Sequence, residues 1–155
     1  MWKNKVRQTL RIRKANTEDY KEIQKISQEE LDYECTPDFV KHRLENIDDN
    51  NEAVFVADEN GAAVGFIHAD IYRTLYFEWM INILGIAVSK SCQKKGYGKE
   101  LMTTAENWSK EKGIKIVRLK KARSVPGIPC LYQISLKLKH LPGTGRCKKN
   151  IKIFR

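Results

Sequence analysis

Hydrophobic and polar residues alternate at the start of the chain and then change to a helical spacing. Residues 10–13 alternate apolar and polar side chains, which predicts a half-buried strand. Asn16 or Thr17 can cap a following helix, and apolar side chains then recur every third position from Tyr20 to Ile26. The pattern predicts a strand followed by a helix.

A second helix is predicted soon after the first. Thr36 is a suitable N-cap, and Pro37 suits the first helical position because proline has no N–H group to leave unpaired there. Val40, Leu44 and Ile47 then form an apolar stripe that one face of a helix can bury. The chain therefore places two helices before its next strand.

Three strands are predicted between residues 53 and 88. Apolar residues 53–57 and 64–72 flank a turn at 58–61, whose Asn60-Gly61 pair tolerates the positive φ angles of a tight hairpin. Residues 79–88 are nearly continuous in apolar side chains, which is typical of a central strand covered on both faces.

A basic, glycine-containing loop at residues 93–98 connects this strand to another helix. Apolar residues recur at helical spacing from Leu101 to Trp108, and Gly113 ends the helix. Residues 114–119 predict a further strand. This order predicts a single-domain α/β (α+β) fold, in which helices flank a mixed, mostly antiparallel central sheet.

Charge divides the 155-residue chain into two parts, although its length and its 41% hydrophobic content suit one domain. Residues 1–113 contain 17 Lys and Arg and 19 Asp and Glu, which gives them a net charge of −2. Residues 114–155 contain 12 Lys and Arg and no Asp or Glu, a net charge of +12, so the whole chain carries +10. We expect a core at residues 1–119 and, within the same domain, an atypical basic segment at 120–155. Since the excess charge is not interleaved with aromatic residues on a folded face, the composition argues against a nucleic-acid-binding protein.

Membrane insertion, secretion and a structural metal site are all disfavoured by the sequence. No apolar run approaches the roughly 18 residues of a membrane-spanning helix, and the polar start of the chain lacks the apolar stretch of a signal peptide. The four cysteines lie far apart without a C-x-x-C pair, which argues against a disulfide framework and a zinc site. We expect a cytoplasmic protein with no metal and no membrane partner.

The loop at residues 93–98 is the feature that points most directly to chemistry. Its two glycines let the backbone turn tightly and approach a ligand, and the N–H groups that start the next helix attract anions. Lys94, Lys95 and Lys99 add positive charge at the same point, which favours a phosphate or pyrophosphate. A tight turn with solubilising lysines is the alternative interpretation. The spacing fits neither a dinucleotide-binding fingerprint nor a P-loop.

The Q-x-x-G-x-G motif at residues 93–98 follows the strand 83–88 and opens the helix 101–108, and in this setting it resembles the acetyl-coenzyme A motif of the GCN5-related N-acetyltransferase (GNAT) family. The order of elements over residues 10–119 is similar as well. The resemblance implies a GNAT-like fold with acetyl-coenzyme A as cofactor. Backbone amides of the loop would hold the pyrophosphate, and the preceding strand would pair with the pantetheine arm and direct an amide at the thioester carbonyl. The residues implied are Gln93, Lys94, Lys95, Gly96, Tyr97, Gly98 and Lys99 in the loop, and Ile86, Ala87 and Val88 in the strand.

The resemblance further implies an acetyl-coenzyme A-dependent N-acetyltransferase, in which a primary amine of a small molecule or peptide attacks the thioester directly in a ternary complex. The main obstacle is a proton, because an amine with a pKa of about 10.4 is almost fully charged at pH 7. Glu78, at the entrance of the central strand, is the candidate base, with His68 and Asp70 as alternatives; each also fits a solvated or sheet residue without a catalytic role. Tyr132 best matches the family's tyrosine that protonates the departing thiolate.

Beyond residue 119 the sequence departs from the family pattern. Pro126 and Pro129 lie where the family has the helix that carries this tyrosine, although a helix from about Cys130 is compatible with Pro129 in its first turn. Residues 134–138 alternate as a strand does.

Three interpretations of this basic tail remain open: a functional basic surface, a solvated structural edge, or a segment read from an altered frame. The alternative to an enzyme is a coenzyme A-binding module or an inactive relative with a damaged acceptor half. A homodimer is also left open. Aromatic residues before the central strand are candidates for an acceptor pocket or for the core: Tyr72, Tyr76, Phe77 and Trp79.

Overall fold

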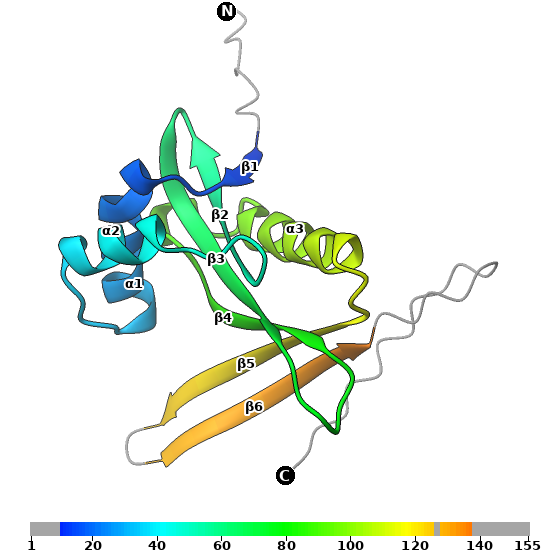
Figure 1. The fold of residues 1–155 in the computed structure, drawn as a ribbon. Helices are drawn as coiled ribbons and strands as arrows, with labels where there is room; N and C mark the ends of the chain where they lie inside the picture. The colour runs from blue at the N-terminus through cyan, green and yellow to red at the C-terminus, as the bar shows by residue number, and fades with distance from the viewer. Residues whose placement is uncertain (1–9, 126–127, 138–155) are drawn as a thin grey trace, which may run out of the picture.

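The computed structural model describes the backbone of residues 10–125 and 128–137 and the side chains of residues 10–119. Within these residues, one sheet with the strand order β1-β2-β3-β4-β5-β6 is flanked by helices (Figure 1). Neighbouring strands are antiparallel except β4 and β5, which are parallel, so the predicted fold class is confirmed. The elements are β1 (Arg11–Lys14), η1 (Thr17–Asp19, a 3-10 helix), α1 (Tyr20–Leu31), α2 (Pro37–Glu45), β2 (Glu52–Glu59), β3 (Ala62–Tyr72), β4 (Met80–Val88), η2 (Lys90–Cys92, a 3-10 helix), α3 (Tyr97–Glu111), β5 (Ile116–Val125) and β6 (Ile128–Lys137).

Local capping groups define the first helical segments. The backbone N–H of Asn16 donates to Asp19 Oδ2 at 2.8 Å where η1 leads into α1. Thr36 Oγ1 accepts a hydrogen bond from the backbone N–H of Phe39 at 3.2 Å, and Pro37 is the first residue of α2. The predicted helix starts are confirmed.

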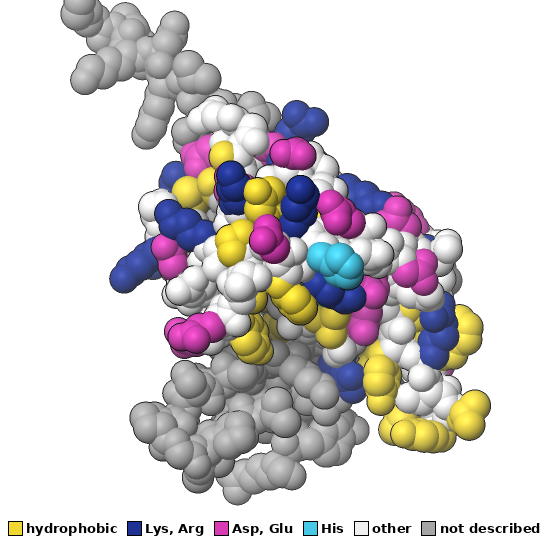
Figure 2. All heavy atoms as spheres, turned by 60° about the vertical axis from the view of Figure 1, so that its left-hand side comes forward, with side chains coloured by type: hydrophobic (Ala, Val, Ile, Leu, Met, Phe, Trp, Pro, Cys, Tyr) yellow, Lys and Arg dark blue, Asp and Glu magenta, His cyan; other side chains and the backbone are white. Residues whose placement is uncertain are grey.

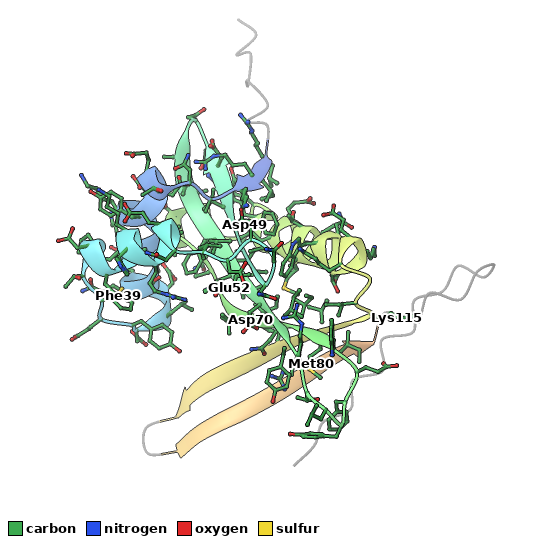
Figure 3. All side chains as sticks on the ribbon, in the orientation of Figure 1. Phe39, Asp49, Glu52, Asp70, Met80 and Lys115 are labelled. Atoms are coloured by element: carbon green, nitrogen blue, oxygen red, sulfur yellow. The ribbon has the colours of Figure 1, made fainter. Side chains whose placement is uncertain are left out.

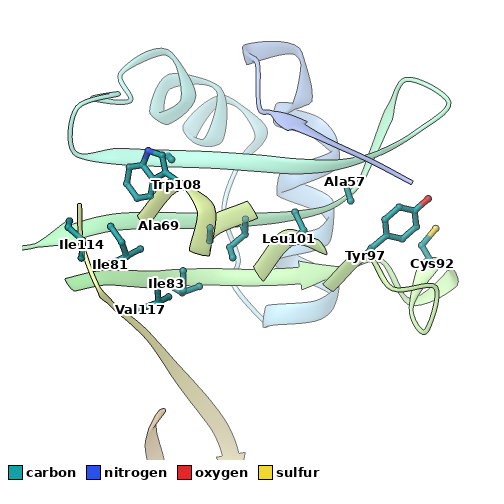
Figure 4. Close-up of a cluster of buried hydrophobic side chains, with 13 residues drawn as sticks. Ala57, Ala69, Ile81, Ile83, Cys92, Tyr97, Leu101, Trp108, Ile114 and Val117 are labelled. Atoms are coloured by element: carbon teal, nitrogen blue, oxygen red, sulfur yellow. The ribbon is translucent and has the colours of Figure 1, made fainter. Parts of the chain in front are cut away.

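The sheet buries a separate hydrophobic cluster on each face. α3 lies on one face, and α1 and α2 lie on the other (Figure 1). The α3 cluster extends from Trp108 and Ile114 at one end to Cys92 and Tyr97 at the other (Figure 4). On the opposite face, helix α1 packs its buried residues onto β2, β3 and β4, through Ile23, Ile26, Val54, Val56, Phe66 and Ala87. The two clusters hold β3 and β4 between helical layers, as their apolar sequences predict.

The β2–β3 hairpin turns at Asn60 and Gly61, as predicted. Their φ angles are +58° and +88°, in the left-handed region that the tight hairpin needs and that glycine and asparagine tolerate. The backbone N–H of Gly61 donates to Asp58 Oδ1 at 2.8 Å and closes the turn.

An irregularity in the middle of β4 opens the sheet. The pairing of β3 with β4 skips Leu84, because His68 pairs with Gly85 whereas Ala69 pairs with Ile83. The parallel pairing of β4 with β5 runs from Ile81 to Ile83 and ends there. Leu84 is 47% exposed as a consequence. Such a bulge bends its strand and ends its pairing, so the second half of β4 has no strand beside it on the β5 side within the described residues.

The segment after β5 differs from the helix that the family resemblance implies. Residues 128–137 form strand β6, which pairs antiparallel with β5 from Val125 opposite Ile128 to Ile116 opposite Lys137. A residue before a proline is biased toward extended backbone, and Val125 and Ile128 each precede one. The expected strand pattern at residues 134–138 is confirmed as far as Lys137, and the position where we divide core from basic segment, after residue 119, falls inside β5.

The charged surface has the mixed character expected of residues 1–113. Figure 2 shows Lys and Arg side chains interspersed with Asp and Glu on the face that it presents. One buried ion-pair network joins the first strand to its neighbours: Arg13 contacts Asp19 at 2.8 Å and Asp58 at 2.7 Å. This network ties β1 to η1 and to β2.

Candidate active site

The loop between β4 and α3 has the geometry of an anion-binding turn. Lys94 and Gly96 both have positive φ angles, +63° and +95°. Gly96 is the N-cap of α3 and offers no side chain to cap it. The N–H groups of the first turn of α3 therefore have no intrahelical partner and point outward at the positive end of the helix dipole.

A cavity of about 310 Å³ lies between this loop, the second half of β4 and the end of α1. A Cβ atom added at Gly98 would meet nothing within 4 Å, so the glycine leaves open space beside the helix start. The residues that line the cavity are Glu30, Leu31, Ile86, Ala87, Val88, Gln93 and Gly98. The structure thus brings the predicted strand residues and two of the predicted loop residues together around one cavity.

Glu30, at the end of α1, holds the loop from the opposite side. Its Oε1 accepts from the backbone N–H of Lys90 at 2.9 Å, and its Oε2 accepts from Gln93 Nε2 at 3.0 Å. Gln93 Nε2 also donates to the carbonyl oxygen of Val88 at 3.0 Å. Sequence reasoning missed Glu30, because nothing local relates a residue in a helix to a loop some sixty positions later.

The lysines and the tyrosine of the loop have different surroundings. Lys94 and Lys99 are exposed beside the loop, whereas Lys95 Nζ lies 3.4 Å from Glu59 Oε1 and is paired. The Tyr97 side chain is only 3% exposed and belongs to the α3 cluster; burial, with the charge of Glu59 beside it, raises the pKa of its phenol. Tyr97 can therefore offer a ligand its backbone N–H and not its side chain.

These features fit the coenzyme that the sequence implies. The cavity joins the unpaired N–H groups of α3 to the second half of β4, where Ile86, Ala87 and Val88 have no strand on the β5 side in the described part of the sheet. Backbone groups on a free strand edge can pair with an amide-containing arm, as in β-strand addition. A phosphate-bearing ligand with such an arm suits both halves of the cavity.

A row of polar residues crosses the sheet from β2 to β5. Glu52 of β2 pairs with Asp70 of β3, Asp70 pairs with Asn82 of β4, and Asn82 pairs with Arg118 of β5. Paired residues point to the same face, and Figure 3 shows Glu52 and Asp70 close together on neighbouring strands. His68 joins the row through its Nε2, which lies 3.1 Å from Glu52 Oε2.

The sequence reveals only part of this row. His68 and Asp70 are alternate residues of one strand, so their common face is predictable. Glu52, Asn82 and Arg118 were missed, because only the register of the sheet places them beside Asp70.

Glu78 and the aromatic residues lie away from the cavity. Glu78 is exposed in the loop between β3 and β4, without a hydrogen bond or ion pair in the described residues. At about 3.3 Å per residue, β4 extends about 20 Å from Met80 to Ile86, so Glu78 is not brought to the coenzyme-facing segment. The aromatic side chains are exposed and are not core residues: Tyr72, Tyr76, Phe77 and Trp79.

Tyr132 lies in strand β6, opposite Lys121 of β5, and not in a helix. β5 lies between β6 and β4, so β5 separates the backbone of Tyr132 from the opening of the sheet. The structure describes the side chains of residues 10–119 only, and the position of the Tyr132 hydroxyl lies outside that range.

None of the helices in the described ranges is long and apolar enough to cross a membrane. Nor does the same part of the chain bring three His, Cys, Asp or Glu side chains together in a way that would hold a metal ion.

Solved structures with a similar fold include several acetyltransferases. An aminoglycoside acetyltransferase from an uncultured soil metagenomic sample, in complex with sisomicin, is 24% identical, with 74% of this chain and 78% of that chain covered and a TM-score of 0.60. A ribosomal-protein-alanine N-acetyltransferase from Brucella melitensis biovar Abortus 2308 is 20% identical (76% and 83% covered, TM-score 0.61). Arabidopsis thaliana NAA60 in complex with acetyl-CoA is 17% identical (74% and 76% covered, TM-score 0.59). At these identities the likeness concerns the fold.

No curated protein sequence matches this chain significantly. A family model described as "Acetyltransferase (GNAT) family" matches residues 13–126, which include the end of β1, all of β2, β3, β4 and β5, the residues that line the cavity, and the loop. That match spans well over half of the chain, and the protein therefore belongs to the acetyltransferase (GNAT) family.

Proposed function

We propose that this protein is an N-acetyltransferase that uses acetyl-coenzyme A as acetyl donor and a primary amine as acceptor, by direct attack in a ternary complex. The observation that carries the proposal is the open space at Gly98, where a cavity joins the unpaired N–H groups of α3 to the free edge of β4. Family membership and the complex of NAA60 with acetyl-CoA support this donor.

The chain's own groups have separate roles in this proposal. Backbone N–H groups of Gly96, Tyr97 and Gly98 bind the pyrophosphate, and the exposed lysines Lys94 and Lys99 add attraction for a multiply charged anion. When bound, acetyl-coenzyme A supplies an acetyl group that is already activated as a thioester. Backbone groups of residues 86–88 align its arm and offer an N–H to the developing oxyanion.

The proton donor is assigned from the family resemblance, and the candidate base from its position in the sequence. Tyr132 is our proposed proton donor to the departing thiolate. Glu78 remains the sequence-based prediction for the base, but its exposed position in the β3–β4 loop offers it no contact with the cavity. Cytoplasmic location and dimer formation also remain predictions.

Two proteins of similar fold suggest which acceptors to test first. One is an aminoglycoside acetyltransferase and another a ribosomal-protein-alanine N-acetyltransferase. Aminoglycoside amines and peptide N-terminal amines are therefore the first acceptors to test, with release of free thiol from acetyl-coenzyme A as the readout.

Calorimetric titration with acetyl-coenzyme A tests the proposal. We expect saturable binding with a Kd in the micromolar range, about −8 kcal/mol. Folded protein that binds no coenzyme would contradict the proposal. Binding without thiol release for any amine would instead support the alternative, a coenzyme A-binding module or inactive relative.

A further inference from the structure

Asp70 stands out among the charged residues of the sheet because one of its carboxylate oxygens is buried without a hydrogen-bond donor in the described part of the chain. In the polar row, Glu52 Oε2 contacts His68 Nε2 at 3.1 Å and Arg43 Nη2 at 3.7 Å. Arg118 Nε donates to Asn82 Oδ1 at 3.1 Å, and its guanidinium lies 4.6 Å from the centre of the Tyr72 ring. Each of these side chains has a partner for its charge or its polar atoms.

Asn82 is hydrogen bonded to the Asp70 carboxylate, but one of the two carboxylate oxygens lacks a partner within the described residues. That oxygen, Oδ1, is buried and accepts no hydrogen bond there, and the carboxylate of Glu52 lies directly opposite on β2. Like charges at opposed positions of a sheet destabilise it, and a buried acceptor without a donor costs about 1–3 kcal/mol. Burial accordingly raises the pKa of the Asp70 carboxyl, although Asn82 and His68 act in the opposite direction. The arrangement weakens the sheet and favours a cationic ligand.

The row also lies where the acetyl group is expected. The pyrophosphate site is the loop after Val88, so the arm of the coenzyme runs back along β4 past Ile86 toward Gly85. On β3, His68 pairs with Gly85, and Asp70 follows two residues later, about 7 Å along the same face. Asp70 as a whole residue is half-buried, whereas its Oδ1 is buried.

We propose that Asp70 is the acceptor-binding group, which holds the protonated amine by charge and receives its proton. This rests on the proposed function and names the residue that selects a cationic amine. In the step, one N–H proton of the ammonium passes to the Asp70 carboxylate. The neutral nitrogen then attacks the thioester carbon, the C–N bond forms and the C–S bond breaks. The hydroxyl of Tyr132, the proposed donor, protonates the sulfur, and the second proton lost by nitrogen restores that hydroxyl. Asp70 returns its proton to solvent.

Glu52, His68 and Arg118 are positioning residues in this proposal. Glu52 Oε2 is already in contact with Arg43 and His68, so Glu52 competes less for the ammonium. Arg118 fixes Asn82 beside Asp70 from the other side. Within the described residues, the subsite thus offers one carboxylate oxygen that accepts no hydrogen bond, beside a glutamate that already has partners.

The test compares Asp70→Asn with Asp49→Asn, whose carboxylate is exposed and paired with Lys14. For Asp70→Asn we expect kcat/KM for amine acetylation to fall at least 100-fold, affinity for acetyl-coenzyme A to stay within twofold, and the melting temperature to stay level or rise. A residue with a purely structural role would lower the melting temperature when changed. Asp49→Asn should leave all three unchanged.

A second measurement needs no coenzyme. Butylammonium chloride, with 1-butanol as the neutral control, is titrated into the full-length protein while backbone amide signals are followed by NMR. We expect saturable shifts at His68, Asp70 and Asn82 with the cation only, and none in Asp70→Asn. This measurement tests the subsite even if Asp70→Asn folds poorly, because the titration of the wild-type protein is informative by itself.

The outcomes separate the inference from the function on which it rests. Wild-type kcat/KM in Asp70→Asn, or equal shifts with butylammonium and butanol, overturns the role of Asp70 while acetyl-coenzyme A binding upholds the proposed function. If Glu78→Gln loses turnover while Asp70→Asn keeps it, the role of Asp70 is also overturned, and Glu78 becomes the base. If wild-type protein binds no coenzyme, the proposed function fails, and the ammonium titration still decides whether Asp70 binds cations.

Discussion

Glu30 and Gln93, far apart in the sequence, are hydrogen bonded at 3.0 Å, and through this contact the end of α1 holds the coenzyme-facing loop. The same Gln93 amide reaches the carbonyl oxygen of Val88 at 3.0 Å. A carboxylate thus lines a cavity that is expected to hold a pyrophosphate. Glu30 positions the loop, and if the coenzyme binds as proposed, the same carboxylate repels its pyrophosphate.

Glu30→Gln separates these two effects, because it keeps one acceptor oxygen and removes the charge. We expect acetyl-coenzyme A to bind about threefold more tightly at low ionic strength, with the difference fading at 0.5 M salt as the charges are screened. Calorimetry at two salt concentrations measures this. Weaker binding at both concentrations would mean that the lost hydrogen bond matters more than the charge.

Gly98→Val should abolish tight coenzyme binding without disturbing the fold. The new side chain would enter open space and would not disturb the packing of the protein. It would instead occupy the position beside α3 that we assign to the ligand. We expect at least a tenfold loss of affinity and a melting temperature within about 2 °C.

Gly61→Val is the matched control for this glycine replacement. Gly61 also faces open space, but its φ of +88° strains any other residue, and it lies in the β2–β3 turn. We expect lower stability with unchanged coenzyme affinity. If Gly98→Val binds as well as wild type, the loop is only a turn.

Tyr132→Phe tests the proton donor that the resemblance implies. If the hydroxyl protonates the thiolate, kcat should fall about 100-fold while the Kd for acetyl-coenzyme A stays unchanged. Tyr33→Phe, at an exposed position after α1, is the control and should keep wild-type turnover. Equal rates for Tyr132→Phe and wild type would remove Tyr132 from the mechanism.

Arg13→Gln should lower the free energy of unfolding by about 2 kcal/mol at pH 7, because it leaves the buried carboxylates of Asp19 and Asp58 without their cation. The hydrogen bond from Arg13 lowers the pKa of Asp58. A lowered folded-state pKa adds stability above the unfolded pKa of about 3.9, and that stability is lost as pH falls through the folded value.

Urea unfolding between pH 7 and pH 2.5 measures this effect. The free energy of unfolding of the wild type should fall below about pH 4. For Asp58→Asn, the free energy of unfolding should be lower at pH 7 and should change less as the pH falls. Asp49→Asn, which removes an exposed ion pair, should follow the wild-type curve to within about 0.5 kcal/mol. Parallel curves for wild type and Asp58→Asn would contradict the prediction.

The sequence alone determined the features that depend on near neighbours. Thr36 and Pro37 start α2, Asn60 and Gly61 turn the β2–β3 hairpin, and the glycines of the loop open α3, because each acts through backbone angles and capping bonds within a few residues. The loop motif and the order of elements were sufficient to indicate the family.

Tertiary structure decided what depends on pairing across the sheet. The bulge at Leu84, the contact of Glu30 with Gln93 and the row from Glu52 to Arg118 all depend on register between distant segments, which no local pattern encodes. The helix that the resemblance implies near Tyr132 is a strand for the same reason. Pairing with β5 along its whole length satisfies the backbone of residues 128–137, and an isolated helix of that length is only marginally stable.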